Sequence, residues 1–187
     1  MRVGAMILAA GKASRFGSPK QLLVLDGETL VDRACRIALE AACTPVLRVL
    51  GAHAETILGH PCPHGVHTLV HPGWEQGMGS SLAAGVTNLL RMEPDLDALF
   101  VLLADQPVTT PSLLENMTDQ LASASIVWCG HDDAKGPPAL FSRIHFHELM
   151  SLQGDRGAKA VIARHQATLM AFPDAAWDID SPEAWER

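Results

Sequence analysis

Two uninterrupted apolar runs place the strongest limit on what this chain can fold into. One occupies residues 3–8 (Val-Gly-Ala-Met-Ile-Leu) and the other residues 98–104 (Ala-Leu-Phe-Val-Leu-Leu-Ala). Neither run alternates polar with apolar residues, as a strand with one face in water would. Such runs are typical of central strands in a parallel sheet that helices cover on both faces. They predict the middle of an α/β sheet.

The segments around these runs alternate between strand and helix patterns. Apolar residues recur on one helix face from Leu30 to Ala41, and Thr110 followed by Pro111 is typical of a helix start. Shorter strands are predicted at 46–50, 66–70 and 125–129, and helices at 29–42, 80–90 and 112–122. A short helix is predicted between the strands at 46–50 and 66–70. This alternation predicts an α/β fold with three layers (α/β/α) around a mostly parallel, Rossmann-like sheet. We expect a single domain over residues 1–187.

The chain after residue 130 is less regular. Residues 132–138 are polar and rich in Pro and Gly, which predicts a loop, and residues 139–141 predict a short strand. Helices are predicted at 145–152 and 159–165.

Charge and composition exclude several classes of protein. The chain carries 14 Lys and Arg against 21 Asp and Glu, a net charge of −7, which repels a polyanion, so we expect no nucleic-acid partner. No apolar run approaches the ~20 residues of a membrane span, so we expect no membrane partner. The 4 cysteines lie far apart without a C-x-x-C pair, which suits a reducing compartment and predicts a cytoplasmic protein.

Ligands of open α/β sheets bind beyond the carboxyl ends of the strands. At the first such end, the small residues Ala9, Ala10 and Gly11 let backbone N–H groups approach a phosphate. Arg15 offers a bidentate fork and Lys20 a mobile point charge, both expected to be exposed in the free protein. The segment is neither a Walker loop nor G-x-G-x-x-G. The alternative is an ordinary turn with solvated cations.

Acidic residues supply candidates for a metal site. Asp105 follows the second apolar run, where one or two carboxylates and substrate phosphates could hold Mg²⁺. The alternative is that Asp105 caps the next helix or makes a structural hydrogen bond. Asp178 and Asp180 point to the same side of an extended segment, so one of them could complete the site. Acids at that place could also favour the dipole of a following helix.

Taken together, these segments resemble the MobA-like nucleotidyltransferase family, and most of all its molybdenum cofactor cytidylyltransferases. The matching motifs occur in the family's order over nearly the whole chain. They are Leu8-Ala-Ala-Gly-Lys-Ala-Ser-Arg-Phe-Gly-Ser-Pro-Lys-Gln-Leu22, Trp74-Glu-Gln-Gly-Met-Gly-Ser-Ser-Leu82, Leu103-Ala-Asp-Gln-Pro107, Gly136-Pro-Pro-Ala-Leu-Phe141, Gly154-Asp-Arg-Gly-Ala158 and Asp178-Ile-Asp-Ser-Pro182. The resemblance implies a fold of the nucleotide-diphospho-sugar transferase type.

The resemblance also implies a reaction and its residues. CMP would pass from CTP to the terminal phosphate of molybdopterin, pyrophosphate would leave, and a molybdoenzyme could receive the product. Mg²⁺ would be the cofactor, held by Asp105 and Asp180. The residues implied at the nucleotide are Leu8, Ala9, Ala10 and Gly11 in the first loop, Arg15 and Lys20 at the phosphates, and Gly77 and Ser81 at the base and ribose. Arg15, Lys20 and Asp105 would be the catalytic residues.

Alternatives to this function remain open. The acceptor could be another phosphorylated molecule, a sugar phosphate or an isoprenoid precursor, or the protein could be a non-catalytic nucleotide-binding maturation factor. CTP is expected rather than GTP because Ala10 stands where guanylyl-transferring relatives carry glycine, and its methyl group narrows the base pocket. His71 stands where many relatives carry Asn, and the 132–138 loop departs from the family on the acceptor side.

Histidines suggest a second kind of metal site. His60, Cys62 and His64 have zinc-ligand chemistry, but their spacing matches no standard zinc motif, and prolines place them in a loop. His145 and His147 lie two residues apart, so they cannot share one face of a helix as joint ligands.

Overall fold

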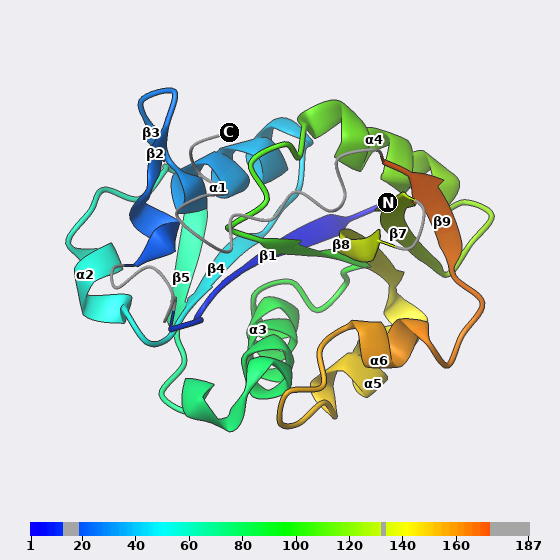
Figure 1. Ribbon diagram of the computed structural model, residues 1–187. Coiled ribbons are helices and arrows are strands. Elements are labelled where there is room, and N and C mark those ends of the chain that lie inside the picture. The colour runs from blue at the N-terminus through cyan, green and yellow to red at the C-terminus, as the bar shows by residue number, and fades with distance from the viewer. Residues whose placement is uncertain (13–18, 132–133, 173–187) are drawn as a thin grey trace.

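A seven-stranded sheet, in the order β5-β4-β1-β6-β8-β7-β9, runs through the protein (Figure 1). The structure, a computed structural model, describes residues 1–12, 19–131 and 134–172. The strands of this sheet are β1 (Val3–Ala9), β4 (Val46–Leu50), β5 (Val66–Val70), β6 (Ala98–Leu103), β7 (Ile126–His131), β8 (Ala134–Ser142) and β9 (Thr168–Ala171). The helices are α1 (Leu30–Glu40), α2 (Ala54–Leu58), α3 (Met78–Met92), α4 (Pro111–Gln120), α5 (Phe146–Met150) and α6 (Lys159–Ile162). Short 3-10 helices are η1 (Lys20–Leu22), η2 (Trp74–Gln76) and η3 (Arg143–His145).

The sheet is mostly parallel, as predicted. β5, β4, β1 and β6 all pair in parallel, with Ala5 of β1 opposite Val46 and Val3 opposite Ala98. β8 runs antiparallel to both of its neighbours, β6 and β7, and β9 pairs in parallel with β7. The β1 and β6 runs therefore lie side by side at the centre of the sheet.

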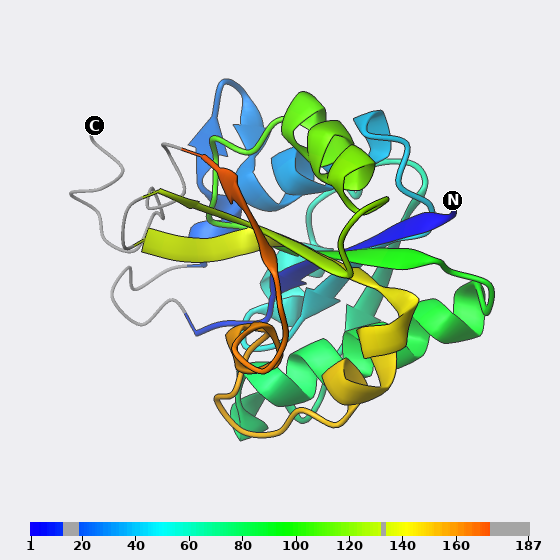
Figure 2. The same cartoon turned by 90° about the vertical axis from the view of Figure 1, so that its right-hand side faces the viewer.

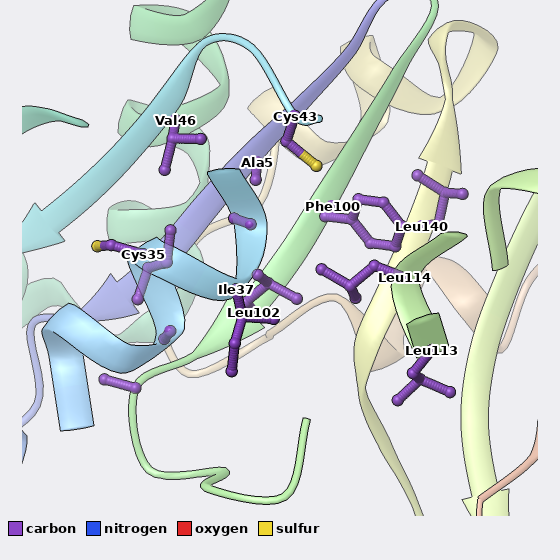
Figure 3. Packing of buried hydrophobic residues seen from close by; sticks show 14 of the residues in the cluster. Ala5, Cys35, Ile37, Cys43, Val46, Phe100, Leu102, Leu113, Leu114 and Leu140 are labelled. Atoms are coloured by element: carbon purple, nitrogen blue, oxygen red, sulfur yellow. The ribbon is translucent and has the colours of Figure 1, made fainter. Parts of the chain in front are cut away.

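Two hydrophobic clusters explain why the central strands are apolar along their whole length. Alternate residues of β1 and β6, such as Ile7 and Phe100, pack against α1 and α4, and the residues between them, such as Met6 and Val101, pack against α3, α5 and α6. Figure 2 shows the sheet between these two helical layers. Figure 3 shows the first cluster, in which Phe100 lies beside Leu114 of α4. The α/β/α prediction is confirmed.

Two helix starts follow their capping residues. The Thr29 hydroxyl accepts a hydrogen bond from Asp32 N at 3.2 Å, so α1 begins at Leu30. The Thr110 hydroxyl accepts from Leu113 N at 3.2 Å, with Pro111 as the first residue of α4. Side-chain capping of the first free N–H groups fixes both helix starts.

The segment predicted as a 132–138 loop is largely strand, and that prediction is wrong from residue 134 onward. β8 runs from Ala134 to Ser142, so the strand predicted at 139–141 is only its end. The pairing with β7 shifts between Trp128 and Cys129, and Pro137 and Pro138 fall within the shift. Prolines donate no backbone hydrogen bond, and a bulge tolerates them because it interrupts the ladder.

Other differences concern short elements at the edges of the fold. The sequence analysis missed β9 and a small hairpin of β2 (Val24–Leu25) and β3 (Glu28–Thr29), although its Asp-Gly turn is a hairpin signal. The helix predicted at 159–165 ends at Ile162, and the one predicted at 145–152 spans only Phe146–Met150. In the described ranges, none of the helices has the length and apolar character to cross a membrane.

Candidate functional site

A cavity of about 640 Å³ lies where β1 and β6 end. This is the edge of the sheet where an α/β fold binds ligands. Its walls come from the end of β1, from η1, from the η2–α3 junction, from the end of β6 and from one residue of the loop before α6. The lining residues are Leu8, Ala9, Ala10, Gly11, Lys12, Lys20, Gln21, Trp74, Glu75, Gly77, Met78, Ser81, Leu103, Ala104, Asp105 and Asp155.

The cavity gathers every described residue that the sequence analysis assigned to the nucleotide. Leu8 to Gly11, Lys20, Gly77, Ser81 and Asp105 all line it, although they are widely separated in sequence. Arg15 and Asp180, and Asp178 beside it, lie outside the described residues. The roles of all of these residues stay predictions.

Gln21 fixes the loop after β1. Its side chain is buried, and its Nε2 donates to the carbonyl oxygens of Ala9 and Gly11, each at 3.1 Å. Its Oε1 is also buried and has no hydrogen-bond partner among the residues that the structure describes. Gln21 holds the curve of the loop and leaves one acceptor without a partner. Gln21 belongs to the first family motif, but no local pattern predicted its role in the loop.

Lys20 and Asp105 form an ion pair inside the cavity, between Lys20 Nζ and Asp105 Oδ2. Only 18% of the Lys20 side chain and 16% of the Asp105 side chain are exposed. The expectation that Lys20 is exposed was therefore wrong, because the chain folds it back onto the end of β6. The capping alternative for Asp105 is also wrong, since Thr110 caps α4.

The second carboxylate oxygen of Asp105 is suited to a hard cation. Asp105 Oδ1 is buried and has no hydrogen-bond partner within the described part of the chain. A buried, unpaired carboxylate oxygen is costly unless something positive or hydrogen-bonding satisfies it. Mg²⁺ and Mn²⁺ favour oxygen ligands of this kind, so Asp105 fits a divalent cation at the cavity.

The opposite wall depends on a close contact between two distant segments. Gly77 has φ 102°, and a Cβ added there would lie 2.4 Å from Gly154 C and 2.7 Å from Asp155 Oδ1. Next to it, Gly79 N donates to Gly154 O at 2.8 Å. Packing against the loop before α6 thus already requires glycine at position 77. The same contact brings the Asp155 carboxylate to the cavity, a placement that no sequence pattern indicated beyond the motif at residues 154–158.

Trp74 and Lys12 close the rim of the cavity. Lys12 Nζ lies 5.2 Å from the centroid of the Trp74 ring, a cation–π distance, and His53 Nε2 lies 2.7 Å from the Lys12 carbonyl oxygen. A Cβ on Gly51 would lie 2.7 Å from both Trp74 Cβ and the Ala10 carbonyl oxygen. Trp74 is therefore packed directly beside the loop after β1.

His71, which departs from the family pattern, supports the turn before α3. Its Nε2 lies 3.0 Å from Ser80 Oγ, which is also 3.0 Å from the carbonyl oxygens of Gly73 and Gly77. His71 is not among the described lining residues of the cavity. Through these contacts His71 stabilises the backbone at the η2–α3 junction.

The three residues weighed as zinc ligands do not come together, in line with a spacing that matches no standard zinc motif. His60, Cys62 and His64 are exposed and form no group of neighbouring ligand atoms. Among the described residues, the group that does bring three such side chains together is His145, Glu148 and His165.

The pKa values in this group are displaced from their ordinary range. Burial, with His165 nearby, lowers the pKa of His145. Hydrogen bonds from His165 and Arg164 lower the pKa of Glu148. The group therefore favours a neutral His145 and an ionised Glu148.

Comparison with known families finds one match over most of the chain. The profile of the family described as "MobA-like NTP transferase domain" matches residues 5–169. Among curated proteins, the chain is 30% identical to nicotine blue oxidoreductase of Paenarthrobacter nicotinovorans, over 99% of this chain and 95% of that protein. It is 28% identical to the molybdenum cofactor guanylyltransferase of Sinorhizobium fredii, over 92% of this chain and 79% of that protein.

A solved structure has nearly the same fold. Rv0371c of Mycobacterium tuberculosis superposes with a TM-score of 0.87 at 28% identity, covering 100% of this chain and 96% of that chain. A complex of the same mycobacterial protein with manganese superposes with a TM-score of 0.83 at 26% identity, covering 100% and 97%. A protein of this fold has therefore been crystallised with manganese.

Proposed function

Because the chain belongs to the family of MobA-like NTP transferase domains, we propose that it transfers CMP from CTP to the terminal phosphate of a molybdopterin-type acceptor. A phosphate oxygen of the acceptor attacks the α-phosphorus of CTP in line. The new P–O bond forms as the bond to the β-phosphate oxygen breaks, and pyrophosphate leaves. The acceptor phosphate is already anionic near neutral pH, so the attack requires no separate base.

The Lys20–Asp105 pair in the cavity is the observation that carries this proposal. Nucleotidyl transfer needs positioning and neutralisation of charge more than a covalent nucleophile. A cation for the phosphates and a carboxylate with an open oxygen supply both kinds of neutralisation. Arg15, which follows the same loop, is proposed to bind the phosphates beside Lys20.

We propose Asp105 and Asp180 as the ligands of Mg²⁺. A bound divalent cation would neutralise charge on the triphosphate and on the leaving pyrophosphate. Asp105 Oδ1 is the oxygen available to it, because Oδ2 pairs with Lys20. Lys20 would then turn its ammonium group from Asp105 to the phosphates.

The base is proposed to lie between the end of β1 and the start of α3. Ala10 lines the cavity from one side, and Gly77 and Ser81 line it from the other. The Ala10 carbonyl is fixed against Gly51 and accepts a hydrogen bond from Ala52 N at 3.2 Å. Since its backbone is held, the Ala10 methyl group cannot easily withdraw to admit a larger base, which favours CTP over GTP.

A redox activity is the second candidate. A relative that aligns over nearly the full length of both chains is named an oxidoreductase. A loop that binds nucleotide phosphates could equally hold the nucleotide half of a dinucleotide cofactor, which would supply the hydride. The two candidates use the same cavity and differ in what the nucleotide donates.

Pyrophosphate release separates these candidates. The protein with Mg²⁺ is incubated with each of CTP, GTP, ATP and UTP, with and without molybdopterin, a sugar phosphate or an isoprenoid-precursor phosphate. We expect release with CTP and molybdopterin, and release slower on the order of 10³-fold with the same mixture and Asp105→Asn. Release only with another acceptor would reassign the acceptor. Nucleotide binding without release in any mixture would favour the maturation factor, and oxidation of NADH or NADPH by a quinoid dye would favour the redox activity.

A further inference from the structure

His145, Glu148 and His165 form a group of nitrogen and carboxylate ligands away from the cavity. One ligand atom from each of the three side chains lies within 4.8 Å of the others, and none of the three is a described lining residue of the cavity. His145 and Glu148 are three residues apart at the start of α5, and His165 follows α6. Figure 1 shows α5 and α6 next to each other, on the face of the sheet that α3 also covers.

The side chains of this group are already held in place. His145 is buried, and its Nε2 lies 2.9 Å from Ser125 Oγ, which fixes the orientation of the ring. The rings of His145 and His165 have centroids 4.5 Å apart. His165 Nε2 lies 2.6 Å from Glu148 Oε2, and Arg164 Nη1 donates to the other oxygen, Oε1, at 2.7 Å. In metal sites a ligating histidine almost always hydrogen-bonds through its other ring nitrogen to an oxygen of a carboxylate, a backbone carbonyl or a water, and the Ser125 hydroxyl takes that place here.

We propose that His145, Glu148 and His165 bind a divalent transition-metal cation of the Zn²⁺ type and thereby join the chain after α6 to α5. Two imidazoles and one carboxylate suit Zn²⁺ and do not suit Mg²⁺, which favours oxygen ligands alone. Tetrahedral zinc at its usual bond lengths separates its ligand atoms by about 3.4 Å. The present separations, 2.6 Å in one pair and at most 4.8 Å in the others, reach that value with side-chain movements alone.

The group is accessible to a cation from solvent, and its three side chains leave one coordination position for a fourth ligand. The His165 side chain is 36% exposed and Glu148 is 23% exposed, so the group opens to solvent on that side while His145 closes it toward the core. Water would complete the four ligands. The cation would replace the proton between His165 and Glu148. Arg164 can keep its bond to Oε1 while Oε2 ligates.

The test is a titration with ZnCl₂ of the full chain after removal of metals by a chelator, in the presence of millimolar Mg²⁺. We expect one Zn²⁺ per chain by calorimetry and by elemental analysis. The expected rise in Tm is about 5–10 °C when free Zn²⁺ exceeds Kd a hundredfold. Glu148→Gln and His165→Ala should each lose this Zn²⁺, and Ser125→Ala should weaken its binding about 10–100-fold.

Two control variants make the test decisive. His147→Ala removes an exposed histidine of the same helix, and Asp105→Asn changes the carboxylate of the cavity; both should keep the bound Zn²⁺. His165 is exposed, so His165→Ala should fold, and its Tm without metal shows whether it does. The proposal is overturned if the wild type binds no more Zn²⁺ than the folded His165→Ala variant. It is independent of the proposed function, because pyrophosphate release does not enter its readout.

Discussion

The cavity at the ends of β1 and β6 and the His145–Glu148–His165 group each hold a largely buried carboxylate, yet the two carboxylates are satisfied differently. Asp105 has one oxygen paired with Lys20 and one buried oxygen without a partner in the described chain. Glu148 has a partner on each oxygen, Arg164 on one and His165 on the other. The cavity therefore keeps one carboxylate oxygen without a partner among the described residues, whereas both oxygens of Glu148 already have one, so a cation at the second group would have to displace a proton.

Asp105→Asn should have the largest effect, because it removes the carboxylate proposed to ligate the cation. Turnover at saturating Mg²⁺ and CTP should fall on the order of 10³-fold. The matched control makes the same chemical change in the other group: Glu148→Gln should leave kcat unchanged. Both are measured by pyrophosphate release per folded protein. Normal turnover in Asp105→Asn would contradict the proposal that Asp105, unlike Glu148, takes part in catalysis.

Lys20→Ala should come next, with two separable consequences. Loss of a cation aimed at the triphosphate should lower kcat/KM for CTP on the order of 10²–10³-fold. It should also destabilise the fold by about 1–3 kcal/mol, since Asp105 loses its partner while largely buried. Arg164→Ala, at an ion pair with 53% of the arginine side chain exposed, should cost less than about 1 kcal/mol.

Denaturant unfolding of four proteins checks the stability part of this comparison: the wild type, the two single variants and Lys20→Ala combined with Asp105→Asn. The double variant should recover part of the stability that Lys20→Ala loses, because it removes the unpaired charge. Equal costs for Lys20→Ala and Arg164→Ala would contradict the difference in burial on which the comparison depends.

Ala10→Gly should change the choice of nucleotide by a smaller factor. One methyl group in a binding pocket is worth about 1–3 kcal/mol, so the preference for CTP over GTP should shrink by roughly 10–200-fold. The ratio of the two kcat/KM values is the quantity to measure. A wild type that uses both nucleotides equally would refute the cytidylyl assignment and leave nucleotidyl transfer intact. Ala163→Gly, an exposed change near the second group, should leave the ratio unchanged.

The smallest effect concerns the reactivity of the cysteine thiols. Burial raises the pKa of Cys43, which lies between α1 and β4, and of Cys129, in β7, to about 12, and it raises the pKa of Cys35, in α1, as well. Raised pKa values keep these groups as unreactive thiols at pH 8. Iodoacetamide should therefore label Cys62, which is exposed, and leave the other three intact. Mass spectrometry identifies the labelled peptides. Label on any of the three buried cysteines would contradict the prediction.

The sequence predicted the parts of the molecule that depend on local pattern. The apolar runs at residues 3–8 and 98–104 indicated the central strands, and the residues at and after their ends indicated the cavity. Contacts between distant segments were not predictable in the same way. Gln21, Asp155 and the burial of Lys20 depend on how loops pack, and His165 meets Glu148 only because α6 returns to α5. Pro137 and Pro138 indicated a loop because no local pattern shows a bulge that accommodates them.

If Lys20 binds the triphosphate and Asp105 the cation, as we propose, the ion pair between them has a consequence for the order in which the ligands bind. In the free protein the two charges compensate each other, so a metal-free triphosphate competes with Asp105 for Lys20, and a lone cation competes with Lys20 for Asp105. A nucleotide that arrives with its cation satisfies both groups in one exchange. Each ligand then raises the affinity for the other by the same factor, as linkage requires. On the proposed function, the pair would therefore favour the metal–nucleotide complex over either component alone.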